Sequence, residues 1–163
     1  MASWPFPDER HVPGKTPRPE ISPAFDAAKA APAYTVDRMW QENLTYQYGV
    51  DLYNAAFFWE AHEVWEPVWM RSGGNSRERL LVQGLIQLSN GCLKIVMERQ
   101  DAAARLLTIA RDKIAEAEHG EPCMMGIALQ SLRNDIEAFR SSLETSTCDG
   151  ESLLRQRPEL ILS

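Results

Sequence analysis

The fold is decided by residues 81–96, LVQGLIQLSNGCLKIV. Apolar side chains recur there at helical spacing and cover about two-thirds of the circumference of the predicted helix. A helix this apolar needs neighbours on several sides, so residues 77–98 are predicted to form the central helix of a bundle. The remaining arc is a polar row at positions i, i+4, i+7 and i+11, which consists of Gln83, Gln87, Asn90 and Lys94.

Two glycines lie beside the polar row, Gly84 and Gly91, seven residues apart. Each costs about 0.5 to 1 kcal/mol relative to alanine inside a helix. We expect them to repay this cost by letting another backbone approach closely.

The chain on either side also has helical patterns and no sustained strand pattern. We expect a helix over residues 36–53, one that carries residues 59–69, one capped by Asp101 that ends near Gly120, and one over 124–144. The last has an apolar seam suited to antiparallel packing within the bundle or against a second copy of the chain. The sequence predicts an all-α fold, a compact antiparallel array of four to five helices, with self-association through apolar helix faces.

The N-terminal segment is rich in proline, with seven of the ten prolines in residues 1–32. Proline blocks regular helix, so residues 1–34 are predicted to form an extended arm, followed by a helical domain over 35–145 and a tail over 146–163. The arm is either a flexible leader or a strap across the domain or a neighbouring subunit. Apolar side chains that could anchor a strap are Trp4, Phe6, Ile21 and Phe25.

Composition narrows the function classes. The chain has 163 residues and a formal net charge of −6, which argues against nucleic-acid binding because dispersed Lys and Arg neutralise phosphate poorly. Its three cysteines form no CxxC pair, and no apolar run reaches the roughly 18 to 20 residues that span a bilayer. We therefore expect a cytoplasmic protein with reduced thiols and no membrane segment.

Reactive groups concentrate in residues 59–69, WEAHEVWEPVW. On a helix, Trp59, His62, Glu63, Glu66 and Trp69 share one arc, and the opposite arc is apolar. Both arcs are predicted to be largely buried, so the ionisable groups need partners.

The segment from about Gly49 to Ile114 resembles the domain of unknown function family 309, small helical proteins of bacteria and archaea. The resemblance rests on EAHE at residues 60–63 and QGLIQ at residues 83–87, a specific combination. It implies the antiparallel helical fold and no activity, since none is assigned to that family. This chain departs from the family where it has Ala56 instead of glycine and Leu93-Lys94 instead of an aromatic-histidine pair.

A metal site is one hypothesis for the cluster, because residues 62–66 have the form HExxE. His62 and Glu66 at i and i+4 could share a divalent metal ion while Glu63 acts as a base, as in a metal-dependent hydrolase. A third ligand would have to come from Glu60, from Asp51 or from another helix.

Two hypotheses need no metal. In the first, His62 and the glutamates form a closed hydrogen-bond network with Gln83, Gln87 and Asn90, which makes the protein a structural or binding module. In the second, Glu63 or Glu66 works with His62 as an acid/base pair in a pocket for a small polar ligand. The side chains predicted to line that pocket are Trp59, Trp69, Gln83, Gln87 and Asn90.

Overall fold

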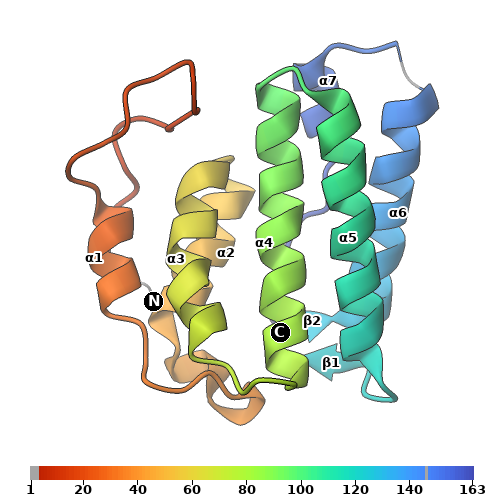
Figure 1. Ribbon diagram of the computed structural model, residues 1–163. Coiled ribbons are helices and arrows are strands. Elements are labelled where there is room, and N and C mark those ends of the chain that lie inside the picture. The colour runs from red at the N-terminus through yellow and green to blue at the C-terminus, as the bar shows by residue number, and fades with distance from the viewer. Residues whose placement is uncertain (1–3, 146) are drawn as a thin grey trace.

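The central helix forms as predicted and organises the molecule. In the computed structural model, which describes residues 4–145 and 147–163, α4 spans Arg77–Val96 and packs against both α3 and α5 (Figure 1). The Ser76 hydroxyl accepts a hydrogen bond from the Arg79 amide and caps the helix. The predicted all-α fold is therefore confirmed.

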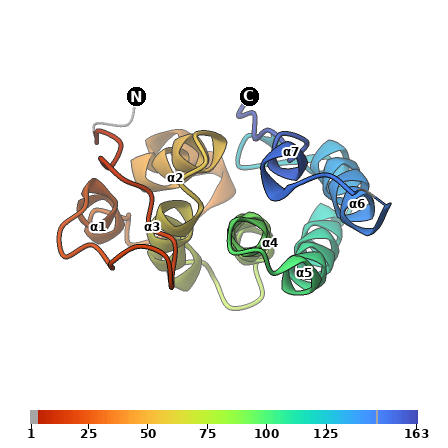
Figure 2. The ribbon, with the colours of Figure 1, turned by 90° about the horizontal axis from the view of Figure 1, so that it is seen from above.

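The other elements surround this helix in chain order. They are α1 (Pro23–Lys29), the 3-10 helix η1 (Asp37–Glu42), α2 (Leu44–Asn54), α3 (Phe58–Met70), α5 (Gln100–Glu118), the strands β1 (Cys123–Met124) and β2 (Ile127–Ala128), α6 (Leu129–Thr145) and α7 (Gly150–Leu154). Seen from above, α1, α2 and α3 lie on one side of α4, and α5, α6 and α7 lie on the other (Figure 2).

The glycines of α4 face α5, as the sequence predicts. A Cβ at Gly84 would stand 2.7 Å from Ile114 Cδ1, and one at Gly91 would stand 2.9 Å from Leu107 Cδ2. Both distances are shorter than ordinary van der Waals contact, so any side chain at these positions would push the two helices apart. The predicted apolar seam of α6 is also used within the chain, since its side chains are buried and α6 packs on α5.

A second close packing joins α2 to α3. Trp65 is fully buried, and its indole N–H donates to the Tyr46 carbonyl oxygen at 3.1 Å. The ring lies directly against the backbone of Gly49, where a Cβ would overlap the indole. Glycine at position 49 is therefore required by the tryptophan that packs on it.

Three local predictions are wrong. The predicted start of the last helix is instead a two-residue antiparallel hairpin, because Met125 and Gly126 have positive φ values that no helix continues through. Helix α5 has Arg99 rather than Asp101 at its N-cap, and Asp101 lies in the first turn. Residues 1–34 are not extended throughout, since α1 begins at Pro23, a first position where proline is tolerated, behind a Ser22 cap.

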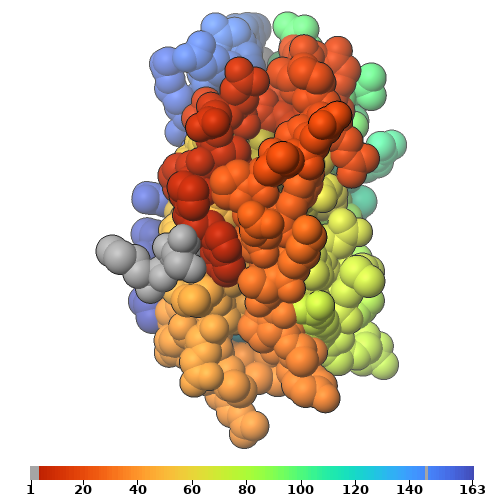
Figure 3. Space-filling model, turned by 90° about the vertical axis from the view of Figure 1, so that its left-hand side faces the viewer, coloured from red at the N-terminus to blue at the C-terminus, as the bar shows by residue number. Residues whose placement is uncertain are grey.

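The N-terminal segment lies against α3, and Figure 3 shows it covering one side of the molecule. The C-terminal residues also dock, because Tyr53 donates to the Pro158 carbonyl oxygen and Asn54 exchanges hydrogen bonds with the Leu160 backbone. The division into arm, domain and tail stays a prediction. Among the described residues, no helix has both the length and the apolar character needed to cross a membrane.

Candidate functional site

Helix α3 has a packed side and an open side. Ala61, Val64, Trp65 and Val68 are inaccessible to solvent, as expected for the apolar arc. The polar arc differs from prediction: the His62 and Glu63 side chains keep 26% and 22% of their surface exposed, and Glu66 is exposed outright. The prediction that both arcs are buried is wrong because α1, α2 and α4 contact the helix on only part of its circumference (Figure 2).

His62 lies on this open side with one ring nitrogen shut in. Its Nδ1 is inaccessible to solvent and has no hydrogen-bond partner among the described residues. The nearest carboxylate oxygen recorded for it, Glu63 Oε1, is 3.8 Å away and beyond hydrogen-bond distance. An imidazole nitrogen in this state carries an unmet desolvation cost of about 1 to 3 kcal/mol. We conclude that the described residues do not satisfy this ring nitrogen.

The polar row of α4 runs alongside α3 without bonding to it. Hydrogen bonds from Ser89 Oγ to the Phe58 carbonyl oxygen and from Arg79 Nη1 to the Trp69 carbonyl oxygen fix the two helices antiparallel. Gln83, Gln87 and Asn90 are half-buried, and over the described chain they make no hydrogen bond with the α3 imidazole or carboxylates. The predicted closed network is therefore not formed within the described chain, since His62 Nδ1 has no partner and Glu66 is exposed.

Trp69 is the second unsatisfied group on the open side of α3. It is partly exposed, but its Nε1 is inaccessible to solvent and lacks a partner within the described chain. The Arg79 guanidinium stacks on the indole at 4.0 Å from the ring centroid, a cation–π contact. Two turns separate Trp69 from His62, so the two residues lie on the same side of the helix, with their backbones about 10 Å apart along its axis.

Trp59, predicted to line the same pocket, lies on another side. Its ring is 93% buried, with the His11 ring edge-on at 4.6 Å and Phe25 at 6.0 Å. Both contacts come from the segment before α2, which covers the first turn of α3. The ring contacts of Trp59 are therefore with the N-terminal segment.

Glu60 is the charged residue that sequence reasoning underrated. It is 99% buried, and its Oε1 accepts a hydrogen bond from the His11 amide at 2.6 Å. Its Oε2 has no partner among the described residues, and burial raises the pKa of this carboxyl above its usual value. Its position between Trp59 and Ala61 was the sequence signal that could have predicted its burial. The sequence named it only as a spare metal ligand.

The HExxE pattern places His62 and Glu66 one turn apart. Over residues 4–145 and 147–163, no group of three or more His, Cys, Asp or Glu side chains could hold a metal ion together. Asp51 and His119 are exposed, and His11 lies against Trp59. A catalytic zinc site needs three protein ligands, so the donor set found here fits that chemistry poorly. The metal hypothesis stays a prediction.

Hollows on the described surface lie away from His62. Five of them are lined by residues other than His62, Glu63 and Gln87. One, of about 350 Å³, includes Gln83 and Arg79 and lies at the start of α4. The open side of α3 is thus a polar face with one of these hollows at its end. We call His62, Glu66, Trp69, Gln83 and Gln87 the polar face.

The comparisons with known proteins agree with the predicted resemblance. Residues 46–106 match the family model described as Domain of unknown function (DUF309), which covers α2, α3, α4 and the start of α5. No curated protein and no solved structure matches the chain. The matched segment contains every residue of the polar face.

Proposed function

Because residues 46–106 match a domain to which no activity is assigned, we propose a function from geometry alone: the protein is a binding module whose polar face takes a small polar ligand. The observation that carries this proposal is the pair of orphaned nitrogens, His62 Nδ1 and Trp69 Nε1, on one side of one helix. The great majority of buried polar atoms in native proteins have a partner. Both nitrogens are covered in this structure, so a ligand would reach them only after neighbouring side chains shift; supplying both partners would then remove two unmet costs of about 1 to 3 kcal/mol each.

The neighbouring groups suit a ligand with both donors and acceptors. The indole N–H can only donate, whereas the neutral imidazole Nδ1 donates or accepts according to its tautomer. The side-chain amides of Gln83 and Gln87 offer both kinds of group beside them. Trp69 is held by the Arg79 stack, so the ligand would meet a surface that is already ordered.

A ligand screen tests the proposal. Thermal unfolding of the wild type would be followed in the presence of free amino acids, dicarboxylates, nucleosides and sugar phosphates, one compound at a time. We expect at least one compound to raise Tm, because a ligand that binds only the folded state stabilises it. The same compound should lose its effect in Trp69→Phe, which removes the indole N–H, and in His62→Ala.

Trp40→Phe is the matched control, since Trp40 is also partly exposed but lies on η1 against Gly126. A compound that stabilises Trp69→Phe and His62→Ala as strongly as the wild type binds elsewhere and contradicts the proposal. A panel without any stabilising compound contradicts it as well.

The metal-dependent hydrolase is the rival, and elemental analysis separates the two. A binding module predicts no stoichiometric metal after purification without chelator, and a Tm that chelator does not change. One equivalent of zinc, manganese or iron that disappears in His62→Ala would favour the hydrolase instead.

A further inference from the structure

The hollow at the end of the polar face has a chemical character of its own. It encloses about 350 Å³ between the start of α4 and the second half of α5. Gln83 belongs both to this hollow and to the polar face, so the two are continuous. Its lining consists of Gly74, Asn75, Ser76, Arg79, Leu80, Gln83, Lys113 and Glu116.

Arg79 lines the hollow and has hydrogen-bond donors that are not used within the described chain. Its Nη1 donates to the Trp69 and Ser72 carbonyl oxygens at 3.2 and 3.4 Å, and its plane stacks on the Trp69 ring. Across the described chain, Nε and Nη2 make no hydrogen bond. A guanidinium held on one edge and one face, with its other edge free, is pre-organised to grip a carboxylate or phosphate.

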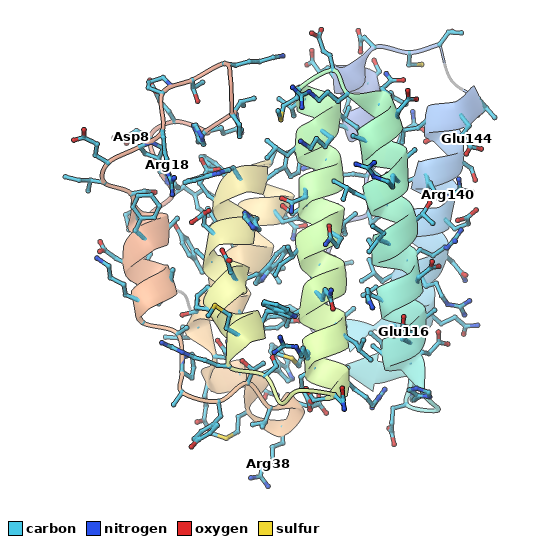
Figure 4. All side chains as sticks on the ribbon, viewed as in Figure 1. Asp8, Arg18, Arg38, Glu116, Arg140 and Glu144 are labelled. Carbon is cyan, nitrogen blue, oxygen red and sulfur yellow. The ribbon has the colours of Figure 1, made fainter. Side chains whose placement is uncertain are left out.

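Lys113 supplies the second positive charge from α5. Its side chain is 28% exposed, and its Nζ lies 3.6 Å from Glu116 Oε1, which is itself more exposed. Glu116 lies on the lower part of α5, toward the end where α4 begins (Figure 4). The neighbouring Glu78 is engaged elsewhere, because its Oε1 accepts from the Asp37 amide. The three charged side chains that line the hollow therefore sum to one positive charge on a chain whose net charge is −6.

From these contacts the geometry points to an anion subsite: the ligand of the polar face carries a carboxylate or phosphate group, which Arg79 and Lys113 bind in this hollow. This inference rests on the proposed function and names the class of ligand. Glu116 is the built-in competitor, since it pairs with the lysine that the anion would take. An organic anion would extend from the hollow past Gln83 toward Trp69.

Inorganic phosphate and acetate are the probes, and they separate the two sources of negative charge. Each would be titrated into the ¹⁵N-labelled full chain while NMR follows the amides of Gly74, Asn75 and Ser76. We expect saturable shifts at these amides for at least one probe. Lys113→Gln should weaken that binding about tenfold, the effect of losing one charge-assisted hydrogen bond. Glu116→Gln should tighten it.

Arg105→Gln is the matched control, because it removes one positive charge from the exposed surface of the same helix. Its affinity for the probe should equal that of the wild type. The anion subsite is overturned if neither probe shifts these amides saturably, or if Lys113→Gln and Arg105→Gln bind equally well.

The two proposals fail separately. His62→Ala should leave the affinity for the bare probe unchanged, since His62 does not line the hollow. If phosphate binds in the hollow but no compound of the panel depends on Trp69, the proposed polar-face function is contradicted and the anion subsite is supported. If a compound of the panel depends on Trp69 but not on Lys113, the polar-face function is supported and the anion subsite is contradicted.

Discussion

Trp65 and Trp69 are four residues apart on the same helix and have opposite surroundings. The Trp65 ring is fully buried, packs on Gly49 and donates its indole hydrogen to Tyr46. The Trp69 ring is partly exposed, and its indole nitrogen is shut in without a partner in the described chain. The first has everything that a core aromatic needs, and the second does not.

The comparison teaches how to separate structural from functional aromatic residues within one motif. A satisfied side chain is explained by the fold that satisfies it. An unsatisfied one costs stability, and the proposed ligand is what would complete it. The four changes below test that distinction, beginning with the largest expected effect.

Gly49→Ala should destabilise the protein most, because its Cβ would overlap the buried Trp65 ring. Overpacking of a rigid aromatic contact costs about 3 kcal/mol, measured as a loss in the free energy of urea unfolding. Gly74→Ala is the control, since nothing lies within 4 Å of its Cβ. Equal stability of the two variants would show that the packing on Trp65 is loose.

Trp65→Phe should cost about 2 kcal/mol, because it leaves a cavity where the larger ring was and removes the hydrogen bond to Tyr46. Chemical denaturation followed by circular dichroism measures the loss. A cost below that of Trp69→Phe would reverse the comparison on which the proposed function depends.

Glu60→Gln should stabilise the protein at pH 7 by about 1 kcal/mol, since the amide avoids burying a charge. Burial raises the pKa of Glu60 above its ordinary 4.5. The stability that the protonated carboxyl contributes is complete below 4.5 and is lost as pH rises through the raised pKa of the folded state.

The difference in the free energy of unfolding between Glu60→Gln and the wild type should therefore be largest at pH 7 and should decrease as pH falls toward 4.5. Urea unfolding at both pH values measures it. A gap that widens on acidification would mean that Glu60 is held as a carboxylate by a group near it. The His11 amide and the Arg10 charge are neighbours that could do this, because both lower the Glu60 pKa that burial raises.

Trp69→Phe should change stability least, by less than about 0.5 kcal/mol. It loses ring area and part of the stack with Arg79, but it also removes a buried donor that no described residue satisfies. Urea unfolding of this variant beside Trp65→Phe gives the comparison directly. A cost above about 1.5 kcal/mol, the usual net value of one hydrogen bond, would mean that the indole already has a partner.

The sequence predicted the elements that have long periodic patterns. Residues 81–96 identify the central helix, and the spacing of Gly84 and Gly91 foretells a close neighbour, which is α5. The short hairpin before α6 was not predicted because it depends on two positive φ values rather than on a periodic pattern of apolar residues. Helix α1 was not predicted because all N-terminal prolines were taken as helix breakers, whereas Pro23 occupies the first helical position, where proline is tolerated.

The surroundings of the predicted site residues follow the sequence only in part. Glu66 was expected to be buried and is exposed, whereas Glu60, for which the sequence predicted no environment, is almost fully buried. HExxE drew attention to Glu66, which is exposed. The buried acid is Glu60, because the N-terminal segment folds over the first turn of α3 and His11 binds it.

By itself the sequence determined the helical class, the central helix and its glycine contacts, because these follow from periodicity along one segment. Only the tertiary structure decided which tryptophan is core, which glutamate is buried, and that Arg79 and Lys113 share one hollow. The physical reason is that burial and pairing depend on what packs against a helix from elsewhere in the chain. Helical spacing says which side chains share a face and leaves open what covers it.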